Sequence, residues 1–422
     1  MHLVPIDMKV IRQSAAYILL VSIYGFTYLV ALLGSLMPRR PWKPTSRIMA
    51  IGTFHNPNWY ISHVSPLSCS GVEEVILIVD EPQMSMDRVR FVCPPKWISK
   101  LLSRAVAKAI WMIIAGLRYR PDLYMGYHFG AGPCSALIAG KLMERPSCCQ
   151  MTGGPVTILG GGIGAIGSVG GALGRPSKFI EALAIRVIRQ FELVVVRGSK
   201  AKEFVTACDI KGAVAIITGG INTRRELAPK DRDIHLIYVG RLSPIKQVDQ
   251  FILIVDCVRR IMPDVGAVIV GDGPLCTDLQ DYVKELELSE NITFPGKTND
   301  VERFLARSKV LILTSKSEGL SIAMAEAMAA GTVPVVADVG ELGDLVVDGV
   351  NGYLIEPGNI NEYAERVVSL LQDQALWNQL SQKAIEAARR HCDVELVSKR
   401  WKKHLREVIS QSSGCSVQDV WS

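Results

Sequence analysis

The stretch His-Leu-Ile-Tyr-Val-Gly-Arg-Leu-Ser-Pro-Ile-Lys, residues 235–246, decides the fold of this 422-residue chain. Its first five residues form a continuous and mostly apolar run, and a helical pattern begins at Lys246. Such a run is typical of a parallel strand covered on both faces. Because α/β sheets bind ligands in the turns after their strands, Arg241 and Lys246 are expected to reach a ligand there.

The same alternation of short apolar runs and longer amphipathic stretches continues on both sides of this segment. The expected strands are Ile48–Ile51, Glu74–Val79, Leu193–Val196, Ala213–Ile217, His235–Val239, Ala267–Val270, Val310–Thr314 and Val333–Ala337. The expected helices are Ser177–Arg189, Lys246–Ile261, Asp278–Leu286, Ile322–Ala330, Ile360–Gln372 and Leu376–Arg390. This alternation predicts an α/β chain with doubly wound parallel sheets. A charged linker, Arg224–Asp233, separates two sets of βαβ units.

Composition supports a folded chain and excludes several classes of protein. With 49% apolar and 21% charged residues, the chain is not disordered, collagen-like or a coiled coil. The ten cysteines contain no pair with zinc-site spacing, so we expect reduced thiols in a cytosolic compartment and no metal centre. The net charge of +6 is too small to indicate a nucleic-acid partner.

Residues 14–37 form an uncharged, largely apolar segment of 24 residues. A helix needs roughly 20 residues to cross a bilayer, whereas the apolar part of a cleaved signal peptide spans only about 7–15. We therefore predict a membrane anchor, single-pass or monotopic. Four basic residues follow the segment within residues 39–47, and Lys9 and Arg12 precede it, which favours the bulk of the chain in the cytosol.

Further motifs follow the opening stretch in a fixed order. They are Gly271–Leu275 (Gly-Asp-Gly-Pro-Leu), Ser317–Leu320 (Ser-Glu-Gly-Leu), Glu326–Gly331 (Glu-Ala-Met-Ala-Ala-Gly) and Asp348–Leu354 (Asp-Gly-Val-Asn-Gly-Tyr-Leu). With these motifs the chain resembles the family 4 retaining glycosyltransferases of the GT-B fold, most densely over residues 234–358. The resemblance implies two Rossmann-like domains facing across a cleft, with a nucleotide sugar in the C-terminal domain and the acceptor in the N-terminal domain.

The resemblance and the anchor together define the expected domains. We expect a membrane helix at 14–37, an acceptor-binding domain at 45–228, a nucleotide-sugar domain at 234–395 and a C-terminal helix at 396–410 that returns to the N-terminal domain. No cofactor and no divalent metal are required by this interpretation.

Two cations and two acids carry the chemistry that the resemblance implies. Arg241 and Lys246 are expected to clamp the diphosphate, whose developing charge must be stabilised as it leaves; the alternative is a pair of solvated surface cations. Glu318 is assigned to the hexose hydroxyls and Glu326 to the ribose hydroxyls. If both stand on one helix, eight steps separate them by about 12 Å and about 80°; the alternative is two exposed helix acids.

Other donor-binding residues are expected in the turns around these four. They are Gly240, Gly271, Gly273, Pro274, Gly296, Lys297, Gly319, Leu320 and Ser321. The glycines of residues 271–274 leave room for a ligand, although they also fit a plain tight turn. Residues 319–321 would open a helix whose N–H groups bind phosphate, and residues 296–297 would frame the base.

The N-terminal domain offers weaker candidates. Relatives often carry a glycine pair after the first strand, where this chain has Asn58 and Trp59. Many relatives also have a histidine after the strand near 147–151, where this chain has Thr152 and Gly153. His128, at the end of another expected strand, is either a side chain facing the acceptor site or a buried structural histidine.

Two further patterns imitate known motifs. Residues 162–167 match the dinucleotide-binding fingerprint Gly-x-Gly-x-x-Gly. They lie in a glycine-rich run, residues 160–174, without the accompanying acidic residue, so we interpret the run as a mobile loop beside the acceptor site. Asp231-Arg232-Asp233 imitates the metal-binding motif of a different glycosyltransferase fold, and we interpret it as a coincidence.

Residues 88–121 contain eight basic residues and no acid. Lys100, Arg104 and Lys108 recur every four residues and so share one face of an expected cationic amphipathic helix. Such a helix suits an anionic leaflet; the alternative is an ordinary sheet-covering helix with a basic edge. Membrane docking of this helix favours a lipid-linked acceptor.

These observations predict a membrane-associated retaining glycosyltransferase. Its partners would be a UDP- or GDP-type nucleotide sugar, a lipid-linked or glycan acceptor and the membrane, in the synthesis of a cell-surface polysaccharide or glycolipid. Two alternatives stay open: a nucleotide-sugar epimerase of the same fold, and an inactive anchored subunit that activates a partner transferase.

Overall fold

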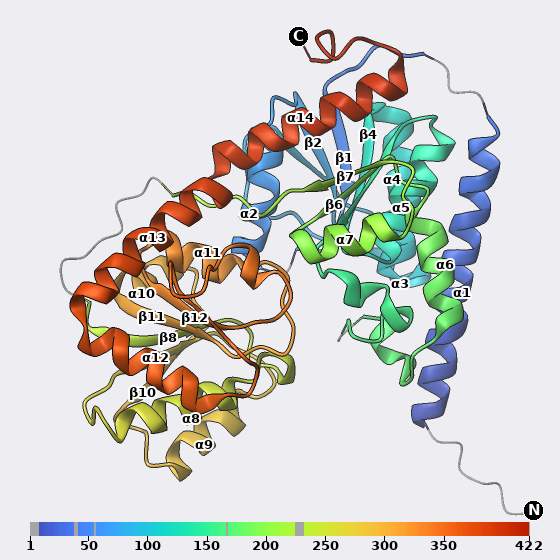
Figure 1. The fold of residues 1–422 in the computed structure, drawn as a ribbon. Helices are drawn as coiled ribbons and strands as arrows, with labels where there is room; N and C mark the ends of the chain where they lie inside the picture. The colour runs from blue at the N-terminus through green and yellow to red at the C-terminus, as the bar shows by residue number, and fades with distance from the viewer. Residues whose placement is uncertain (1–7, 38–40, 55, 166–167, 224–231, 422) are drawn as a thin grey trace, which may run out of the picture. The chain divides into compact units, whose positions relative to one another are not determined.

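A computed structural model describes residues 8–37, 41–54, 56–165, 168–223 and 232–421. The chain divides into two compact units (Figure 1). The first consists of Met1–Ile217 and Ser398–Ser422, and the second of Thr218–Val397. Most of the predicted linker, Arg224–Asp233, lies outside the described residues.

The first unit is built on a seven-stranded sheet in the order β3-β2-β1-β4-β5-β6-β7, whose neighbouring strands all pair in parallel. The strands are β1 (Arg47–Ile51), β2 (Glu74–Ile78), β3 (Val89–Val92), β4 (Leu123–Tyr127), β5 (Ser147–Met151), β6 (Leu193–Val196) and β7 (Ala213–Ile216). Buried Val, Ile and Leu side chains dominate β1, β2 and β6, as both faces of the sheet are covered.

Helices and short 3-10 turns cover this sheet. They are α2 (Pro57–Ser68), α3 (Lys96–Leu102), α4 (Arg104–Tyr119), α5 (Ala131–Leu142), η1 (Pro155–Thr157), η2 (Leu159–Gly161), η3 (Gly170–Leu173), α6 (Lys178–Ile188) and α7 (Ser199–Ala207). The last helix, α14 (Val394–Ser413), belongs to this unit from Ser398 onward. Helices α4 and α5 pack side by side and both contact β1.

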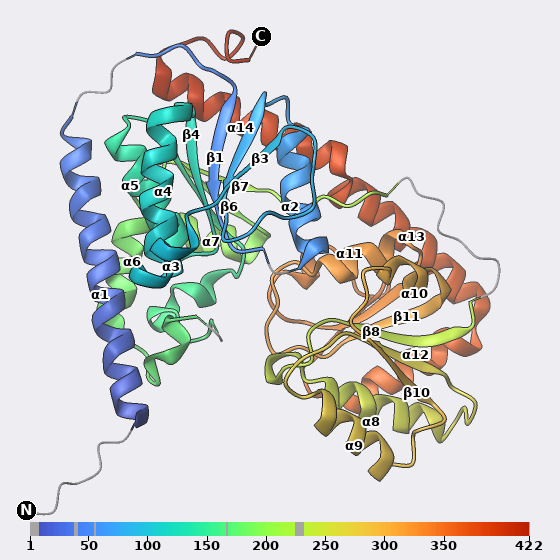
Figure 2. The same cartoon turned by 180° about the vertical axis from the view of Figure 1, so that it is seen from behind.

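The N-terminal helix α1 (Met8–Ser35) packs against α5, α6 and η3 and so forms an outer layer of the first unit (Figure 2). By length and composition alone it could cross a membrane. One side of α1, with Leu20 and Tyr24, is buried against the unit, while the side carrying Ile18 and Phe26 is exposed. The predicted apolar helix is therefore present, and part of its surface is used for packing within the protein.

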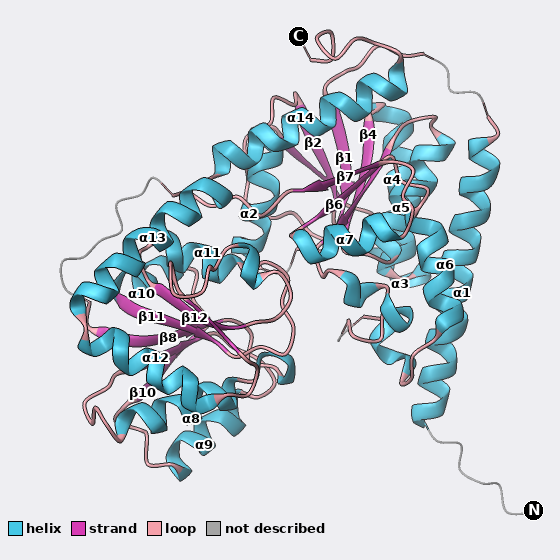
Figure 3. Ribbon diagram, in the orientation of Figure 1, coloured by secondary structure: helices cyan, strands magenta, loops and turns pink. Residues whose placement is uncertain are grey.

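The second unit has a six-stranded parallel sheet in the order β10-β9-β8-β11-β12-β13 (Figure 3). Its strands are β8 (Ile234–Val239), β9 (Ala267–Val270), β10 (Ile292–Gly296), β11 (Ser308–Leu313), β12 (Val333–Ala337) and β13 (Tyr353–Ile355). The helices and turns are η4 (Pro244–Lys246), α8 (Val248–Arg259), α9 (Cys276–Glu285), α10 (Val301–Arg307), α11 (Ile322–Ala329), η5 (Leu342–Asp344), α12 (Ile360–Gln372) and α13 (Gln374–Cys392). The predicted α/β class with two parallel Rossmann-like sheets is confirmed.

The predicted cationic helix differs from the structure in two ways. The chain breaks at Ser103, whose φ of 75° ends α3 and starts α4, so Lys100 and Arg104 do not share one helix face. Lys108 is buried and its Nζ lies 2.8 Å from a carboxylate oxygen of Asp80. The prediction of a single basic face over these three residues is therefore wrong. Lys100 and Arg104 are exposed, whereas Lys108 is part of the interior.

Candidate functional site

The candidate site of the second unit lies at the carboxyl ends of its central strands. Strand β8 pairs with β9 on one side and with β11 on the other, which is the point where strand order reverses. Ligands of open α/β sheets bind outside the strand ends at such a point. Three loops meet there, at residues 240–247 after β8, 271–275 after β9 and 314–321 after β11.

The first two of these loops pack closely through their backbones. The amide of Leu242 donates to the carbonyl of Asp272 at 3.0 Å. A Cβ on Gly271 would lie 1.9 Å from the carbonyl oxygen of Gly240, and one on Gly273 would lie 2.2 Å from that of Leu242. With its φ of 151°, Gly271 also adopts a backbone conformation that other residues rarely reach. Contact between two protein loops is therefore enough to require these glycines.

An ion pair joins the loop after β8 to the loop after β11. Lys246, at the end of η4, places its Nζ 2.5 Å from Oε1 of Glu318, and the hydroxyl of Ser315 donates to the same oxygen at 2.7 Å. The loops are also tied by the hydroxyl of Thr314, which donates to the carbonyl of Gln247 at 2.7 Å. Lys246 and Glu318 were predicted as two separate site residues. Nothing in the local sequence indicates that residues 72 positions apart form an ion pair.

The two acids do not stand on one helix. Helix α11 begins at Ile322, with Ser321 as its N-cap accepting a hydrogen bond from the amide of Met324 at 3.3 Å. Glu318 precedes this cap, so the predicted eight helical steps between Glu318 and Glu326 are wrong. A Ser-Glu-Gly-Leu loop leads into the helix instead, and only Glu326 is helical.

Glu326 lies mostly buried in the middle of α11. Burial, with the negative charge of nearby Glu302 adding to it, raises the pKa of Glu326 to about 7. The ion pairs found in the described part of the chain do not include Glu326. The prediction of an exposed helix acid, which was the alternative for this residue, is therefore wrong.

The remaining predicted donor residues surround this group. Arg241 is exposed two positions after β8, and its carbonyl accepts a hydrogen bond from Tyr238 at 3.1 Å. Gly296 ends β10 with a φ of 77° and open space where a Cβ would stand, and Lys297 beside it is exposed. Pro274 is exposed, Gly319 and Ser321 are half-buried, and Leu320 is buried.

In the first unit, the structure brings His128 and Thr152 together. His128 follows β4 with a φ of 60°, and its Nδ1 forms a short hydrogen bond with the Thr152 hydroxyl. Its ring stacks on Trp59 with centroids 4.9 Å apart, and the side chain is exposed. The alternative of a buried structural histidine is therefore wrong for His128. Gly153 continues the same loop.

An aromatic cluster at this edge was not predicted. Trp59 stacks on His63 with centroids 4.1 Å apart, and both lie on α2 with the spacing of one helical turn. The ring of Phe54 packs against those of Trp59 and Tyr127, with ring centroids 5.3 Å apart in both pairs. Burial, reinforced by the charge of Arg197, lowers the pKa of His63 well below its usual range. The Trp-x-x-x-His spacing was the available signal, but Pro66 near the end of α2 obscured the helix.

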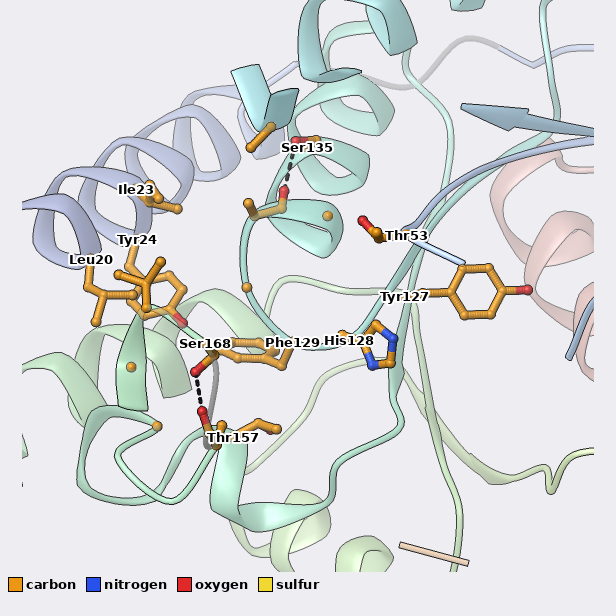
Figure 4. Close-up of a pocket in the computed structure, with 18 of the residues that line it drawn as sticks. Leu20, Ile23, Tyr24, Thr53, Tyr127, His128, Phe129, Ser135, Thr157 and Ser168 are labelled. Carbon is orange, nitrogen blue, oxygen red and sulfur yellow. Dashed lines mark hydrogen bonds between the residues drawn. The ribbon is translucent and has the colours of Figure 1, made fainter. Parts of the chain in front are cut away.

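A cavity of about 270 Å³ opens at the same edge of the first sheet (Figure 4). Its walls come from α1, the start of α4, the loop between β4 and α5, and the glycine-rich segment. The described part of that segment, Gly160–Ala165 and Ser168–Gly174, forms η2, η3 and the turns beside them. The Gly-x-Gly-x-x-Gly pattern thus does not open a helix after a strand; its residues 166 and 167 lie outside the described residues.

Asp233, the described acid of the imitated metal motif, forms an ion pair outside the candidate site. Asp231 lies outside the described residues, and Asp233 stands at the amino end of β8, away from the site. Asp233 accepts a hydrogen bond from Nε of Arg307 at 2.8 Å. The interpretation of this motif as a coincidence fits that ion pair.

Solved structures define the class of fold. An Anabaena protein, HepE, crystallised with UDP, aligns with a TM-score of 0.68 at 18% identity, over 86% of this chain and 100% of that chain. TarM of S. aureus aligns with a TM-score of 0.57 at 19% identity, over 70% of this chain and 58% of that chain. With its two parallel Rossmann-like sheets, the chain has the GT-B fold.

Sequence comparison adds the family. Residues 221–391, which lie within the second unit, match the family described as glycosyl transferases group 1. N-acetyl-alpha-D-glucosaminyl L-malate synthase of Bacillus anthracis is 30% identical over 167 residues, which are 39% of this chain and 43% of that protein. A UDP-Gal:alpha-D-GlcNAc-diphosphoundecaprenol alpha-1,3-galactosyltransferase of Escherichia coli is 29% identical over 171 residues, 40% of this chain and 44% of that protein. The chain thus spans less than half the length of these curated relatives.

Proposed function

We propose that this protein is a membrane-associated, retaining glycosyltransferase. It would move a sugar from a UDP-type nucleotide sugar to a lipid-linked or glycan acceptor during synthesis of a cell-surface polysaccharide or glycolipid. The observation that carries the proposal is the Lys246–Glu318 ion pair at the reversal point of the second sheet, with Arg241 exposed in the same loop as Lys246.

The charges of this edge suit a diphosphate. Lys246 donates one of its three ammonium N–H groups to Glu318, and the other two can donate to phosphate oxygens. The exposed Arg241 adds a planar set of guanidinium donors that can bind a phosphate. The start of α11 contributes backbone N–H groups and the positive end of the helix dipole. The Anabaena neighbour crystallised with UDP and with UDP-glucose supports a uridine donor.

The two acids suit the hydroxyl groups of the donor. Glu318 is held by Lys246 and Ser315 through Oε1, which leaves its Oε2 to accept from a sugar hydroxyl. Glu326 is a mostly buried carboxyl whose pKa is raised by burial and by the charge of Glu302. A ribose offers two neighbouring hydroxyl donors, which would bind this carboxyl and favour its ionised form.

The reaction follows from these roles. The acceptor oxygen forms a bond to the anomeric carbon on the face from which the diphosphate departs, and the bond from that carbon to the phosphate oxygen breaks. The acceptor proton passes to the leaving phosphate oxygen. Lys246 and Arg241 stabilise the charge that develops there, and no protein nucleophile takes part.

Membrane association is supported by two surfaces of the first unit. The outer side of α1 exposes Ile18 and Phe26, with 65% and 60% of their surfaces accessible. On α3, Trp97 and Leu101 are 67% and 74% exposed beside the cations Lys96 and Lys100. Exposed apolar side chains that alternate with cations are typical of a surface bound to anionic lipid.

Calorimetry with UDP and GDP, followed by a panel of UDP-sugars with membranes as the acceptor source, tests the proposal. We expect UDP to bind wild-type protein, and one donor to label membrane-extractable material. The Lys246→Ala variant should lose transfer, while a variant at the exposed Lys383 of α13 serves as the matched lysine control. Turnover of the donor without any acceptor would indicate the epimerase, and absence of nucleotide binding would refute the proposal.

A further inference from the structure

The cavity of the first unit has an apolar wall formed by the N-terminal helix. Leu20, Ile23 and Tyr24 of α1 line it, and the ring of Tyr24 packs on that of Phe129, with centroids 5.7 Å apart. Figure 4 shows these three side chains of α1 on one side of the cavity and Thr53 and His128 on the other. The same helix thus presents exposed apolar residues on its outer side and a cavity wall on its inner side.

The opposite end of the cavity is polar and held in place. Nζ of Lys108 reaches the cavity wall and donates to Oγ1 of Thr53 at 3.0 Å and to the carbonyl of Gly52 at 3.2 Å. Asp80 neutralises this ammonium at 2.8 Å. With its charge already paired, Lys108 serves to fix the loop after β1. The exposed His128, bonded to Thr152, completes this end of the wall.

Glycine backbone forms much of the remaining wall. A Cβ on Gly162 would lie 2.8 Å from the carbonyl oxygen of Thr157, and one on Gly170 would lie 2.6 Å from that of Gly162. These residues permit a tightly folded segment whose backbone, without side chains, faces the cavity. Close backbone packing within the segment therefore explains why glycines stand in this run, without a bound dinucleotide.

The first turn of α4 connects the cavity to the exposed basic and apolar surface. Ala105 lines the cavity, and its neighbours Arg104 and Val106 are both exposed. Val106 continues an exposed apolar row along α4 with Ile110 and Ile114. The cavity is thus lined in part by two elements, α1 and α4, that each carry exposed apolar side chains.

We propose that this cavity binds the lipid-proximal part of a lipid-linked acceptor that enters from the membrane. Hydrocarbon packs against Leu20, Ile23 and Tyr24 of α1, and the sugar of the acceptor lies toward Thr53 and His128. An apolar wall at one end and hydroxyl and imidazole groups at the other match an amphipathic molecule. A water-soluble glycan would leave the apolar wall unused. This inference rests on the proposed transferase activity and names the acceptor class.

Filling the cavity tests the inference. Ile23→Trp adds volume to the cavity wall, and Ile261→Trp makes the same change at an exposed position of the second unit. The substrates are a radiolabelled UDP-sugar chosen from the donor panel and a lipid extract of membranes. We expect Ile23→Trp to raise the KM for the lipid about tenfold, since a loss of that size corresponds to roughly 1.4 kcal/mol of binding. Ile261→Trp should keep the wild-type KM.

A direct probe guards against misfolding of the filled variant. Wild-type protein is irradiated with a farnesyl diphosphate-linked N-acetylglucosamine that carries a diazirine in its isoprenyl chain, and labelled peptides are mapped by mass spectrometry. Label on the inner residues Leu20, Ile23 or Tyr24 supports the inference. Label confined to the outer residues Ile18 and Phe26 overturns it.

The two proposals fail in different ways. UDP binding and transfer by wild-type protein, together with an unchanged lipid KM in Ile23→Trp, would overturn the cavity inference and leave the transferase intact. Transfer to a water-soluble glycan with none to the lipid extract would do the same. Absence of UDP binding by the wild type would remove the proposed function itself.

Discussion

Replacing Glu326 by glutamine should make the stability of the second unit less sensitive to pH. The folded carboxyl has a pKa of about 7, whereas the ordinary value for glutamate is 4.5. Between these values the folded state holds a proton that the unfolded state has released, so the stability of the wild type falls as pH rises from about 4.5 to about 7. Below that window the carboxyl is protonated in both states and contributes no penalty.

The magnitude follows from the two pKa values. At 1.36 kcal/mol for each pKa unit, the wild-type penalty grows from about 1 kcal/mol at pH 5 to roughly 3 kcal/mol above pH 7. The neutral amide of Glu326→Gln keeps the size of the side chain and carries no such penalty. The unfolding free energy of the variant, relative to that of the wild type, should therefore rise by about 2 kcal/mol between pH 5 and pH 7.5.

Pulsed hydrogen exchange across a urea series measures the free energy of unfolding of the second unit alone. Peptides from β11 and β12 report its unfolding, and wild type and variant are compared at each pH so that intrinsic exchange rates cancel. Adding UDP should reverse the ranking at pH 7.5, because ribose hydroxyls would favour the ionised wild-type carboxylate. A stability difference that stays constant from pH 5 to pH 8 would refute the assigned pKa and the reasoning built on it.

Three other perturbations have defined outcomes. Lys246→Ala should lower kcat for transfer by about 100-fold or more at saturating donor, as expected when one donor to a developing anion is lost; a near-normal kcat would contradict the diphosphate clamp. Gly271→Ala places a Cβ 1.9 Å from a carbonyl oxygen and should destabilise the second unit by at least about 3 kcal/mol. Gly349→Ala, with open space at its Cβ and a φ of 68°, should cost only about 1 kcal/mol, and equal melting temperatures for the two variants would be inconsistent with loop contact. Phe26→Asp, on the exposed side of α1, should lower flotation with anionic vesicles about tenfold and leave the melting temperature unchanged; unaltered flotation would deny that side a role at the membrane.

Removal of α1 is a less informative experiment than its apolar sequence suggests. Leu20 and Tyr24 are buried against the first unit, so deletion would expose the surfaces of α5 and α6 that they cover. Loss of membrane binding would then be mixed with loss of stability. The single substitution Phe26→Asp avoids this because its side chain is not part of the packed face.

The regular part of the fold could be predicted from the sequence because parallel strands buried on both faces leave a strong local pattern. Runs such as Leu193–Val196 and Ala267–Val270 match β6 and β9 residue for residue. Short edge strands leave a weaker pattern: β3 has only four residues, none of them fully buried, and β13 has only three residues. Helix α2 was missed because Pro66 interrupts its sequence, although the helix tolerates it near its end.

The candidate site could be predicted only as a set of residues. Which of them meet depends on tertiary contacts that leave no local trace, as the Lys246–Glu318 pair illustrates. Periodicity also misled where it assumed an unbroken helix. The spacing of Lys100, Arg104 and Lys108 fits one face only if the chain stays helical at residue 103, and the positive φ there separates Lys100 from the other two. Lys108 lies in the interior, where it pairs with Asp80, a residue distant in the sequence.

The course of α14 has a practical meaning for dissection of the chain. Its residues from Ser398 onward, including the buried Trp401 and Leu405, complete the unit that begins at the N-terminus. The backbone therefore passes between the units at two places, after Ile217 and after Val397. A fragment cut once between the units would leave the N-terminal piece without its last helix and the C-terminal piece with an uncovered apolar one. Expressing the first unit by itself calls for rejoining the part of α14 from Ser398 onward to the first 217 residues through a new linker, whereas the second unit calls for a fragment that ends at Val397.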